Sequence, residues 1–187
     1  MSLSTDFINS PQNFIINHSI LIPGGTTAPH AGNGNFQFNA NGVNSALLQS
    51  SAPGTNIAGY YARPVPNNNN VFPLPTQQQN DYFMFTDAMN GCQFIAYGPD
   101  RQHVTVEHNN FIGNPAAYAL RLAAIVAQGH TYFFHLTAGA APFNVAQGNY
   151  DLLTGLNIIG RYTQQYGWTF WVRDRLDQNI GNLVGPF

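Results

Sequence analysis

The chain has 187 residues, which suits one domain, and 44% of them are hydrophobic, enough to build a sizeable core. Charged residues make up only 7%, against roughly 25% in an ordinary globular protein. The six basic residues are all arginines spread along the chain, and the net charge is −2, which argues against nucleic-acid binding and against a basic membrane-binding patch.

The sequence also lacks the signals of several other classes of protein. No segment approaches the ~18 consecutive apolar residues of a membrane-spanning helix. Residues 1–14 lack the basic start and the apolar stretch of a cleaved secretory leader, so we expect any export to use another route. Cys92 is the single cysteine, and the sequence shows no metal-ligand spacing and no complete glycine motif for a nucleotide. We therefore expect no disulfide, no metal and no cofactor.

The N-terminal part of the chain predicts strands and loops. Residues 14–22 are apolar and β-branched and are followed by Pro-Gly-Gly, which predicts a buried strand. Residues 26–59 alternate Gly, Asn, Ser and Ala with short apolar islands, which predicts short strands joined by loops. Residues 63–80 contain four prolines and runs of Asn and Gln, which predicts a long and mobile surface loop.

The C-terminal part predicts a helix followed by strands. Asn114 and Pro115 precede a run of strong helix formers that ends at Gly129, which predicts a helix over 115–128. Apolar segments separated by turn residues predict a strand at 130–136 and a C-terminal β-hairpin of two strands at 156–162 and 168–173. Many strands with few helices favour an α+β fold, and we expect residues 1–187 to form one domain.

The segment between these parts holds the residues with the most distinctive chemistry. Gly98-Pro99-Asp100 is a turn sequence that separates two β-like runs, 92–97 and 103–108, which predicts a hairpin. With Asp100 at its centre, Cys92 would lie opposite His108 at the open end. The same register would place four apolar side chains on the face that Cys92 and His108 share, those of Phe94, Ala96, Val104 and Val106.

Cys92 and His108 are candidates for a nucleophile and its base. Directly opposed residues have Cβ atoms about 4.5–5.5 Å apart, which brings an imidazole within reach of a thiolate. Gly91 allows a tight turn beside the cysteine, and the backbone amides of Gly91 and Cys92 would form an oxyanion hole. The alternative is that Cys92 is a small buried core residue. His103 is predicted to lie on the opposite face and to be exposed.

The residues around Cys92 resemble a known family of enzymes. Residues 86–92, Thr-Asp-Ala-Met-Asn-Gly-Cys, followed by His108 on the next strand, are similar to the active-site segment of the Burkholderia lethal factor type of glutamine deamidase. That group is related to the catalytic domain of the cytotoxic necrotizing factors. Gly91 and Cys92 match the Gly-Cys corner of the family, and Thr86 matches a threonine six residues before the cysteine. Met and Asn replace the Leu-Ser pair that precedes the corner in the family.

The resemblance implies both a fold and a reaction. The fold would be a mixed, β-sandwich-like sheet flanked by helices, and the reaction would hydrolyse a protein glutamine side chain to glutamate. Catalytic roles would belong to Cys92, His108 and Thr86, without a cofactor or a metal. The relatives modify Rho-type small GTPases or a translation-initiation helicase, so the partner would be a host protein, and the chain would be secreted or translocated into the host cytosol.

Two other functions remain open on the sequence. The amide-rich, aromatic and charge-poor composition is also typical of a non-catalytic β-rich module that binds a glycan or a protein, although we expect Trp168 and Trp171 mainly to pack in the core. A different thiol hydrolase or acyltransferase could use the same Cys/His pair.

Overall fold

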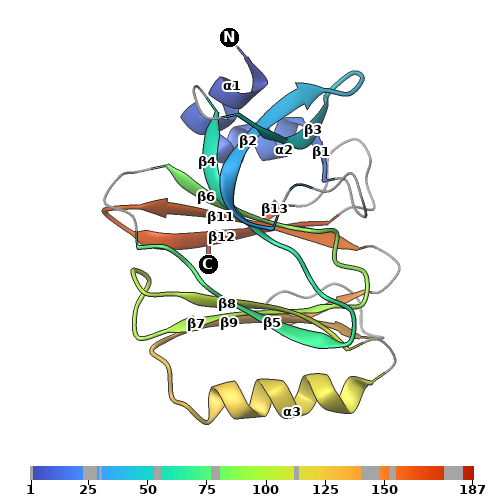
Figure 1. The fold of residues 1–187 in the computed structure, drawn as a ribbon, viewed down its shortest axis with the longest axis vertical. Helices are drawn as coiled ribbons and strands as arrows, with labels where there is room; N and C mark the ends of the chain where they lie inside the picture. Colours follow the sequence, from blue (N-terminus) through green and yellow to red (C-terminus); the bar gives the residue numbers. More distant parts are fainter. Residues whose placement is uncertain are drawn as a thin grey trace.

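Two β-sheets stack face to face and carry helices on their outer sides (Figure 1). The computed structural model describes residues 2–22, 29, 31–52, 56–76, 81–111, 114–139, 148–151, 155–174 and 183–187. Helices α1 (Leu3–Asn9) and α2 (Pro11–Asn17) lie against the larger sheet, and α3 (Pro115–Val126) lies along the smaller one (Figure 1). The chain is a single α+β domain rich in β-structure, as predicted. Within the described residues, no helix is both long and apolar enough to cross a membrane.

The larger sheet is mixed and has eight strands among the described residues, in the order β1-β3-β2-β4-β6-β11-β12-β13. Two of its pairs are parallel, β1 with β3 and β4 with β6, and the others are antiparallel. The predicted C-terminal hairpin is confirmed, because β11 and β12 pair over their whole length. The strands are β1 (Ser19–Leu21), β2 (Gly32–Ala40), β3 (Ser45–Ser51), β4 (Ile57–Ala62), β6 (Tyr82–Thr86), β11 (Leu156–Thr163), β12 (Gly167–Asp174) and β13 (Leu183–Val184).

The smaller sheet has five strands among the described residues, in the order β10-β9-β7-β8-β5. Its centre is the predicted hairpin of β7 and β8, and β9 confirms the strand predicted at 130–136. β9 and β10 are parallel, and the other pairs are antiparallel. The strands are β5 (Asn68–Pro73), β7 (Gln93–Gly98), β8 (Thr105–Asn110), β9 (Tyr132–Gly139) and β10 (Asn149–Asp151).

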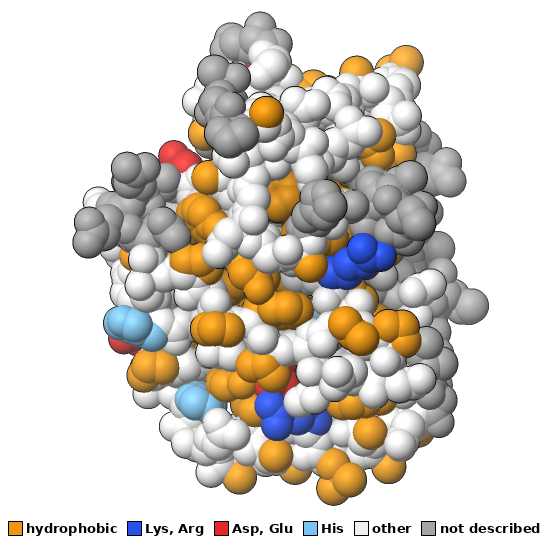
Figure 2. Space-filling view, in the orientation of Figure 1, with side chains coloured by type: hydrophobic (Ala, Val, Ile, Leu, Met, Phe, Trp, Pro, Cys, Tyr) orange, Lys and Arg blue, Asp and Glu red, His pale blue; other side chains and the backbone are white. Residues whose placement is uncertain are grey.

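Among the described residues, two large hydrophobic cores and a small one under α3 hold these layers together. The main core fills the space between the sheets, where alternate residues of each strand point inward, among them Phe94, Val106, Leu136 and Trp168. The second core lies between the larger sheet and the N-terminal helices and is rich in phenylalanine, with members that include Phe7, Phe14, Phe36, Phe83 and Phe85. The outer surface carries few charges, and Figure 2 shows them scattered among hydrophobic and uncharged polar side chains on one face.

Helix α3 begins and ends close to where its sequence signals predict. The Asn114 side chain accepts a hydrogen bond from the backbone N–H of Ala117 at 3.1 Å, and Pro115 occupies the first helical turn. Arg121 on the inner side of the helix binds the buried carboxylate of Glu107 on β8. This ion pair and the packing around Ile125 attach α3 to the sheet that carries His108.

Two predictions made from composition are wrong. Residues 14–17 belong to helix α2 and not to a strand, and within 14–22 only Ser19–Leu21 pair as a strand. Pro11 in the first turn favours the helix, and burying Phe14 and Ile15 outweighs the weak helix preference of the β-branched residues. The predicted loop over 63–80 contains strand β5, because an edge strand needs only backbone pairing, here with β8. Residues 77–80 lie outside the described part of the chain.

Candidate functional site

The β7–β8 hairpin has the predicted face but not the predicted register. Phe94 lies opposite His108, and Ala96 lies opposite Val106, so the pairing is displaced by two residues from the one expected. The displacement arises in the turn, where the carboxylate of Asp100 accepts hydrogen bonds from the backbone N–H groups of Gln102 and His103, at 2.7 and 2.9 Å. A shift by two residues keeps every side chain on its original face.

Cys92 and His108 are therefore diagonal neighbours on the inner face of the smaller sheet. Diagonal positions on one face lie about 7–8 Å apart, with the side chains closer than that, so a thiol and an imidazole can still meet. Both side chains are buried, since His108 is 0% exposed and Cys92 is 5% exposed. Cys92 belongs to the main core, which agrees with the alternative that it packs as a core residue as well as with a catalytic role.

The hydrogen bonding of His108 fixes its tautomer. Its Nδ1–H donates to the backbone carbonyl of Ala62, at the end of β4, at 3.0 Å. Its Nε2 is buried and has no hydrogen-bond partner among the described residues. Burial lowers the pKa of His108 below its ordinary value of 6.5, against the opposing effects of the Ala62 carbonyl and the Asp87 charge. His108 is thus a neutral imidazole with a free lone pair on Nε2, the form that a general base requires.

Cys92 rests as a thiol and not as a thiolate. Burial and, to a smaller extent, the negative charge of Asp87 raise its pKa to about 11. A neutral thiol becomes nucleophilic only when a base takes its proton during attack. If His108 serves Cys92, the proton must therefore move during the reaction, and not from a preformed ion pair.

Two tyrosines hold the Gly91–Cys92 corner. The hydroxyl of Tyr150 on β10 accepts a hydrogen bond from the Gly91 N–H at 3.1 Å and donates to the Cys92 carbonyl at 2.6 Å. The hydroxyl of Tyr118 on α3 donates to the Gly91 carbonyl at 2.6 Å and accepts from the Phe111 N–H at 2.8 Å. Gly91 has a φ of 117°, which a residue with a side chain rarely adopts. The corner is fixed by contacts that no local sequence pattern indicates.

The contacts of Tyr150 limit the oxyanion hole that the sequence predicts at Gly91 and Cys92. The Gly91 N–H is already engaged by the Tyr150 hydroxyl, so it could bind an oxyanion only after exchanging this partner. The Cys92 N–H, beside the sulfur, is the better candidate donor of the two.

Thr86 joins two strands of the larger sheet beside the site. Its hydroxyl accepts a hydrogen bond from the Ile158 N–H at 3.0 Å, and its carbonyl accepts one from the Asn157 side chain at 3.3 Å. Thr86 is fully buried, and these bonds give it the position of an anchor at the end of β6. Asp87 follows Thr86 directly in the chain, so the bonds of Thr86 also help to position Asp87.

Asp87 is the charged group whose field reaches both candidate catalytic side chains. Its Oδ1 accepts a hydrogen bond from the Tyr61 hydroxyl, and its Oδ2 lies 4.0 Å from Nε of Arg63. Its charge favours protonated His108 and disfavours ionised Cys92, so it supports an imidazolium that forms during the reaction. No local sequence pattern indicates that Asp87 acts on both side chains.

His103 lies away from the site, as predicted. Its side chain is 62% exposed, and its Nδ1 lies 2.9 Å from the carboxylate of Asp100 in the same turn. His103 is therefore not the base that serves Cys92. Among the residues that the structure describes, no cluster of three or more His, Cys, Asp or Glu side chains could hold a metal ion.

Comparison with known proteins leaves the site to be interpreted from its own geometry. No protein-family model matches the chain, and no curated protein matches it either. The likeness to the glutamine deamidases rests on the residues of the Cys92 segment and on His108.

Replacing Tyr150 with phenylalanine is expected to loosen the Cys92 corner. The variant loses the acceptor of the Gly91 N–H and the donor to the Cys92 carbonyl, so the free energy of unfolding should fall by about 1–3 kcal/mol. Urea unfolding measures this loss, and alkylation of native Cys92 by iodoacetamide should become faster. The control is Tyr166→Phe, at a side chain that is 61% exposed, which should change neither quantity measurably. Equal values for Tyr150→Phe and wild type would contradict the role assigned to the hydroxyl.

Proposed function

We propose that the chain is a cysteine-dependent protein-glutamine deamidase with Cys92 as nucleophile and His108 as general base and acid. The observation that carries this proposal is that His108 is oriented by the Ala62 carbonyl and that its Nε2, on the buried face shared with Cys92, has no hydrogen-bond partner in the described part of the chain. A nucleophile, a base, and a third group that orients the base are the parts that nucleophilic catalysis requires. The resemblance of residues 86–92 to the deamidases gives the reaction type.

The reaction follows from these groups. Nε2 of His108 takes the thiol proton as the sulfur of Cys92 attacks the δ-carbon of the glutamine carboxamide. The C–N bond of the tetrahedral intermediate then breaks, His108 returns the proton to the leaving nitrogen, and ammonia departs from a thioester. A water molecule, deprotonated by the same imidazole, hydrolyses the thioester to glutamate and restores the thiol. Asp87 stabilises the imidazolium that exists between these proton transfers.

The burial of the site favours a glutamine side chain as the group that enters it. Cys92 is only 5% exposed, so a substrate must place a slender group against the sulfur. A glutamine side chain has two methylene groups and a neutral carboxamide, and a neutral group loses far less hydration on burial than a charged one. The product glutamate is anionic and would be repelled by Asp87, which favours its release.

The cellular setting of this activity is part of the same proposal. By its resemblance to the deamidases, the chain would act on a host protein, either a Rho-type small GTPase or a translation-initiation helicase, after secretion or translocation into the host cytosol. The charge-poor surface makes specific protein contacts more plausible than phosphate-driven ones.

Mass spectrometry of a host cytosolic extract tests the proposal directly. The extract is incubated with wild type or with Cys92→Ser, and tryptic peptides are compared. We expect one or a few glutamines to gain the mass of deamidation with wild type only. Free ammonia should appear in the same samples. A complete absence of modified glutamine with folded wild-type protein, in extracts that contain both classes of host target, would overturn the proposal.

A further inference from the structure

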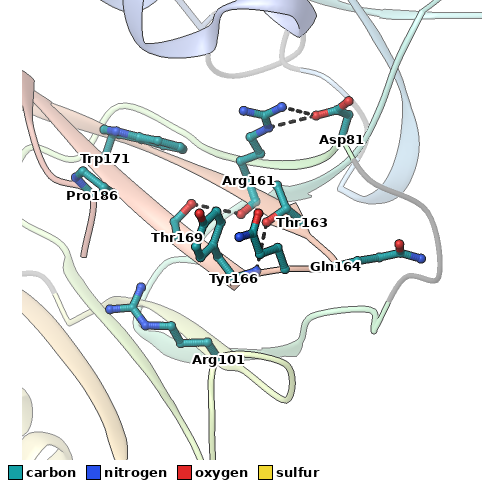
Figure 3. Close-up of a pocket in the computed structure, with 10 residues that line it drawn as sticks. Asp81, Arg101, Arg161, Thr163, Gln164, Tyr166, Thr169, Trp171 and Pro186 are labelled. Atoms are coloured by element: carbon teal, nitrogen blue, oxygen red, sulfur yellow. Dashed lines mark hydrogen bonds and ion pairs between the residues drawn. The ribbon is translucent and has the colours of Figure 1, made fainter.

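A cleft of about 780 Å³, drawn in Figure 3, lies beside the β11–β12 turn and the turn of the β7–β8 hairpin. It is formed by the turn between β11 and β12, by outward-facing residues of these strands, and by Arg101 from the β7–β8 turn. Strand β11 starts at Leu156, which bridges Met89 near Cys92, and ends at Thr163 in the cleft. Eight residues of strand span about 23 Å between their ends, so the cleft is separate from the deamidase site.

The charged side chains of the cleft already have partners, because Asp81 pairs with Arg161 and Arg101 binds a backbone carbonyl and an aromatic ring. Nε of Arg161 donates to the carboxylate of Asp81 at 2.9 Å, and Nη2 donates to the same oxygen. Figure 3 shows Arg161 and Asp81 reaching toward each other along one side of the cleft. Arg101 donates from Nη1 to the Phe187 carbonyl at 2.7 Å, and its guanidinium lies 5.1 Å from the centre of the Tyr132 ring. An anionic ligand would have to compete with these contacts, so the cleft suits a neutral one.

The strands that line the cleft leave no backbone edge for an extended peptide. β11 lies between β6 and β12. The other edge of β12 pairs with β13, and Phe170 exchanges backbone hydrogen bonds with Phe187 at 3.0 and 3.4 Å. A peptide that binds by adding a strand needs unpaired backbone groups, which these strands do not offer at the cleft.

The remaining lining combines aromatic rings with planar polar groups. The ring of Tyr166, at the β11–β12 turn, is 61% exposed, and the largely buried Trp171 forms a wall on one side together with Pro186 (Figure 3). The Gln165 side chain, on the same turn, is exposed and also lines the cleft. Rings offer a face for C–H groups, while amides and an Arg–Asp pair offer paired donors and acceptors.

We propose that this cleft binds a neutral oligosaccharide. A pyranose ring has apolar C–H faces, which would stack on Tyr166, and pairs of adjacent hydroxyl groups at its edge. In the Arg161–Asp81 pair both guanidinium donors bind Oδ1 of the carboxylate, so the pair presents further guanidinium N–H donors and Oδ2 as an acceptor side by side, which matches such a hydroxyl pair. The volume of the cleft is in the range of small-molecule sites, enough for about two or three sugar units. This binding is independent of the proposed deamidation.

A printed array of neutral and sialylated oligosaccharides tests the cleft with wild type and three variants. Wild type is expected to bind neutral members. Tyr166→Ala should lower affinity for the best-bound neutral glycan about tenfold through loss of the stacking ring, while Tyr166→Phe should keep most of it. Asp81→Asn should shift binding toward sialylated members, because Arg161 loses its counter-charge. Asp81 has a φ of 66°, a conformation that asparagine also accepts, so this variant should fold.

Two controls separate this site from the rest of the molecule. Phe133→Ala removes another partly exposed ring, on β9 of the other sheet, and should leave glycan binding unchanged. Cys92→Ser should also leave it unchanged, so failure of the deamidase proposal and failure of the glycan site appear in different measurements. Wild type that binds no member of the array, wild type that binds only sialylated members, or unaltered binding by Tyr166→Ala would overturn the proposal.

Discussion

Replacing His108 with asparagine is expected to slow deamidation about a thousandfold while leaving the protein folded. The asparagine side-chain N–H can still donate to the Ala62 carbonyl, which His108 engages at 3.0 Å. What the variant loses is the Nε2 lone pair that removes the thiol proton of Cys92 and later protonates ammonia. Single-turnover rates on the glutamine peptide found in the cytosolic extract measure this loss.

The pH profile adds a readout that a purely structural role would not change. Activity should be level from neutral pH upward, because neutral imidazole and neutral thiol form the active pair and the Cys92 pKa is about 11. Activity should fall on acidification only below the ordinary histidine pKa of 6.5, because burial lowers the pKa of His108. In the asparagine variant, this acid limb should disappear.

The matched control for His108 is His103, the exposed histidine of the same hairpin. His103→Asn removes an imidazole that pairs with Asp100 and has no place in the site, so the rate should stay within about twofold of wild type. A His108→Asn variant that folds and turns over at the wild-type rate would remove His108 from the mechanism.

Replacing Arg121 with methionine is expected to cost about 3 kcal/mol or more of stability. Glu107 is 0% exposed and accepts hydrogen bonds from Tyr97 at 2.9 Å, from Asn109 at 3.0 Å and from Nε of Arg121 at 2.8 Å. Without Arg121, its carboxylate would be buried without the positive charge that now pairs with it. Chemical denaturation of both proteins measures the difference.

The pH dependence of this effect has a defined sign. Burial alone raises the pKa of Glu107, but its hydrogen bonds to Arg121, Asn109 and Tyr97 outweigh burial and lower it. In wild type, Glu107 therefore contributes stability above the pKa of an unfolded glutamate, about 4.3, and that contribution is lost as pH falls through the lowered folded pKa. In Arg121→Met, the cost of burying the charged Glu107 carboxylate dominates, and protonation of this carboxylate removes that cost. The difference in the free energy of unfolding between wild type and Arg121→Met should therefore narrow on acidification.

Two further variants check the cause of the loss. Adding Glu107→Gln to Arg121→Met removes the buried charge and should recover part of the stability. Arg63→Met alters an arginine whose side chain is 38% exposed and whose Nε lies 4.0 Å from Asp87, and it should cost less than about 1 kcal/mol. A loss for Arg121→Met no larger than the loss for Arg63→Met would contradict the importance of the buried pair.

The sequence predicts the elements that carry local signals. Helix α3 follows from Asn114, Pro115 and a run of helix formers, and the β11–β12 hairpin follows from two apolar runs around a turn. The face of β7 and β8 is also predictable, because side chains alternate with a period of two. Their register is not, because it depends on how many residues the Asp100 turn takes up.

The sequence indicates only some of the residues that form the candidate site. Cys92, Gly91 and His108 stand out by residue type, whereas Ala62 contributes a backbone carbonyl, which has no sequence signature. Tyr150 lies 59 residues from Gly91 in the chain, and only the parallel pairing of β10 with β9 brings it there. Contacts between distant segments depend on the whole topology, so no spacing rule indicates them.

The larger sheet separates the main core from the phenylalanine-rich core under the N-terminal helices. Phe7 and its neighbours pack on one side of it, and the core that includes Cys92 packs on the other. Proteins open in cooperative units that follow such boundaries, and a unit with its own core can open without the other. The layer formed by α1 and α2 can thus exchange its amide protons through partial opening while the Gly91–Cys92 corner keeps its geometry, which makes the outer layer the more tolerant place for an attached tag or label.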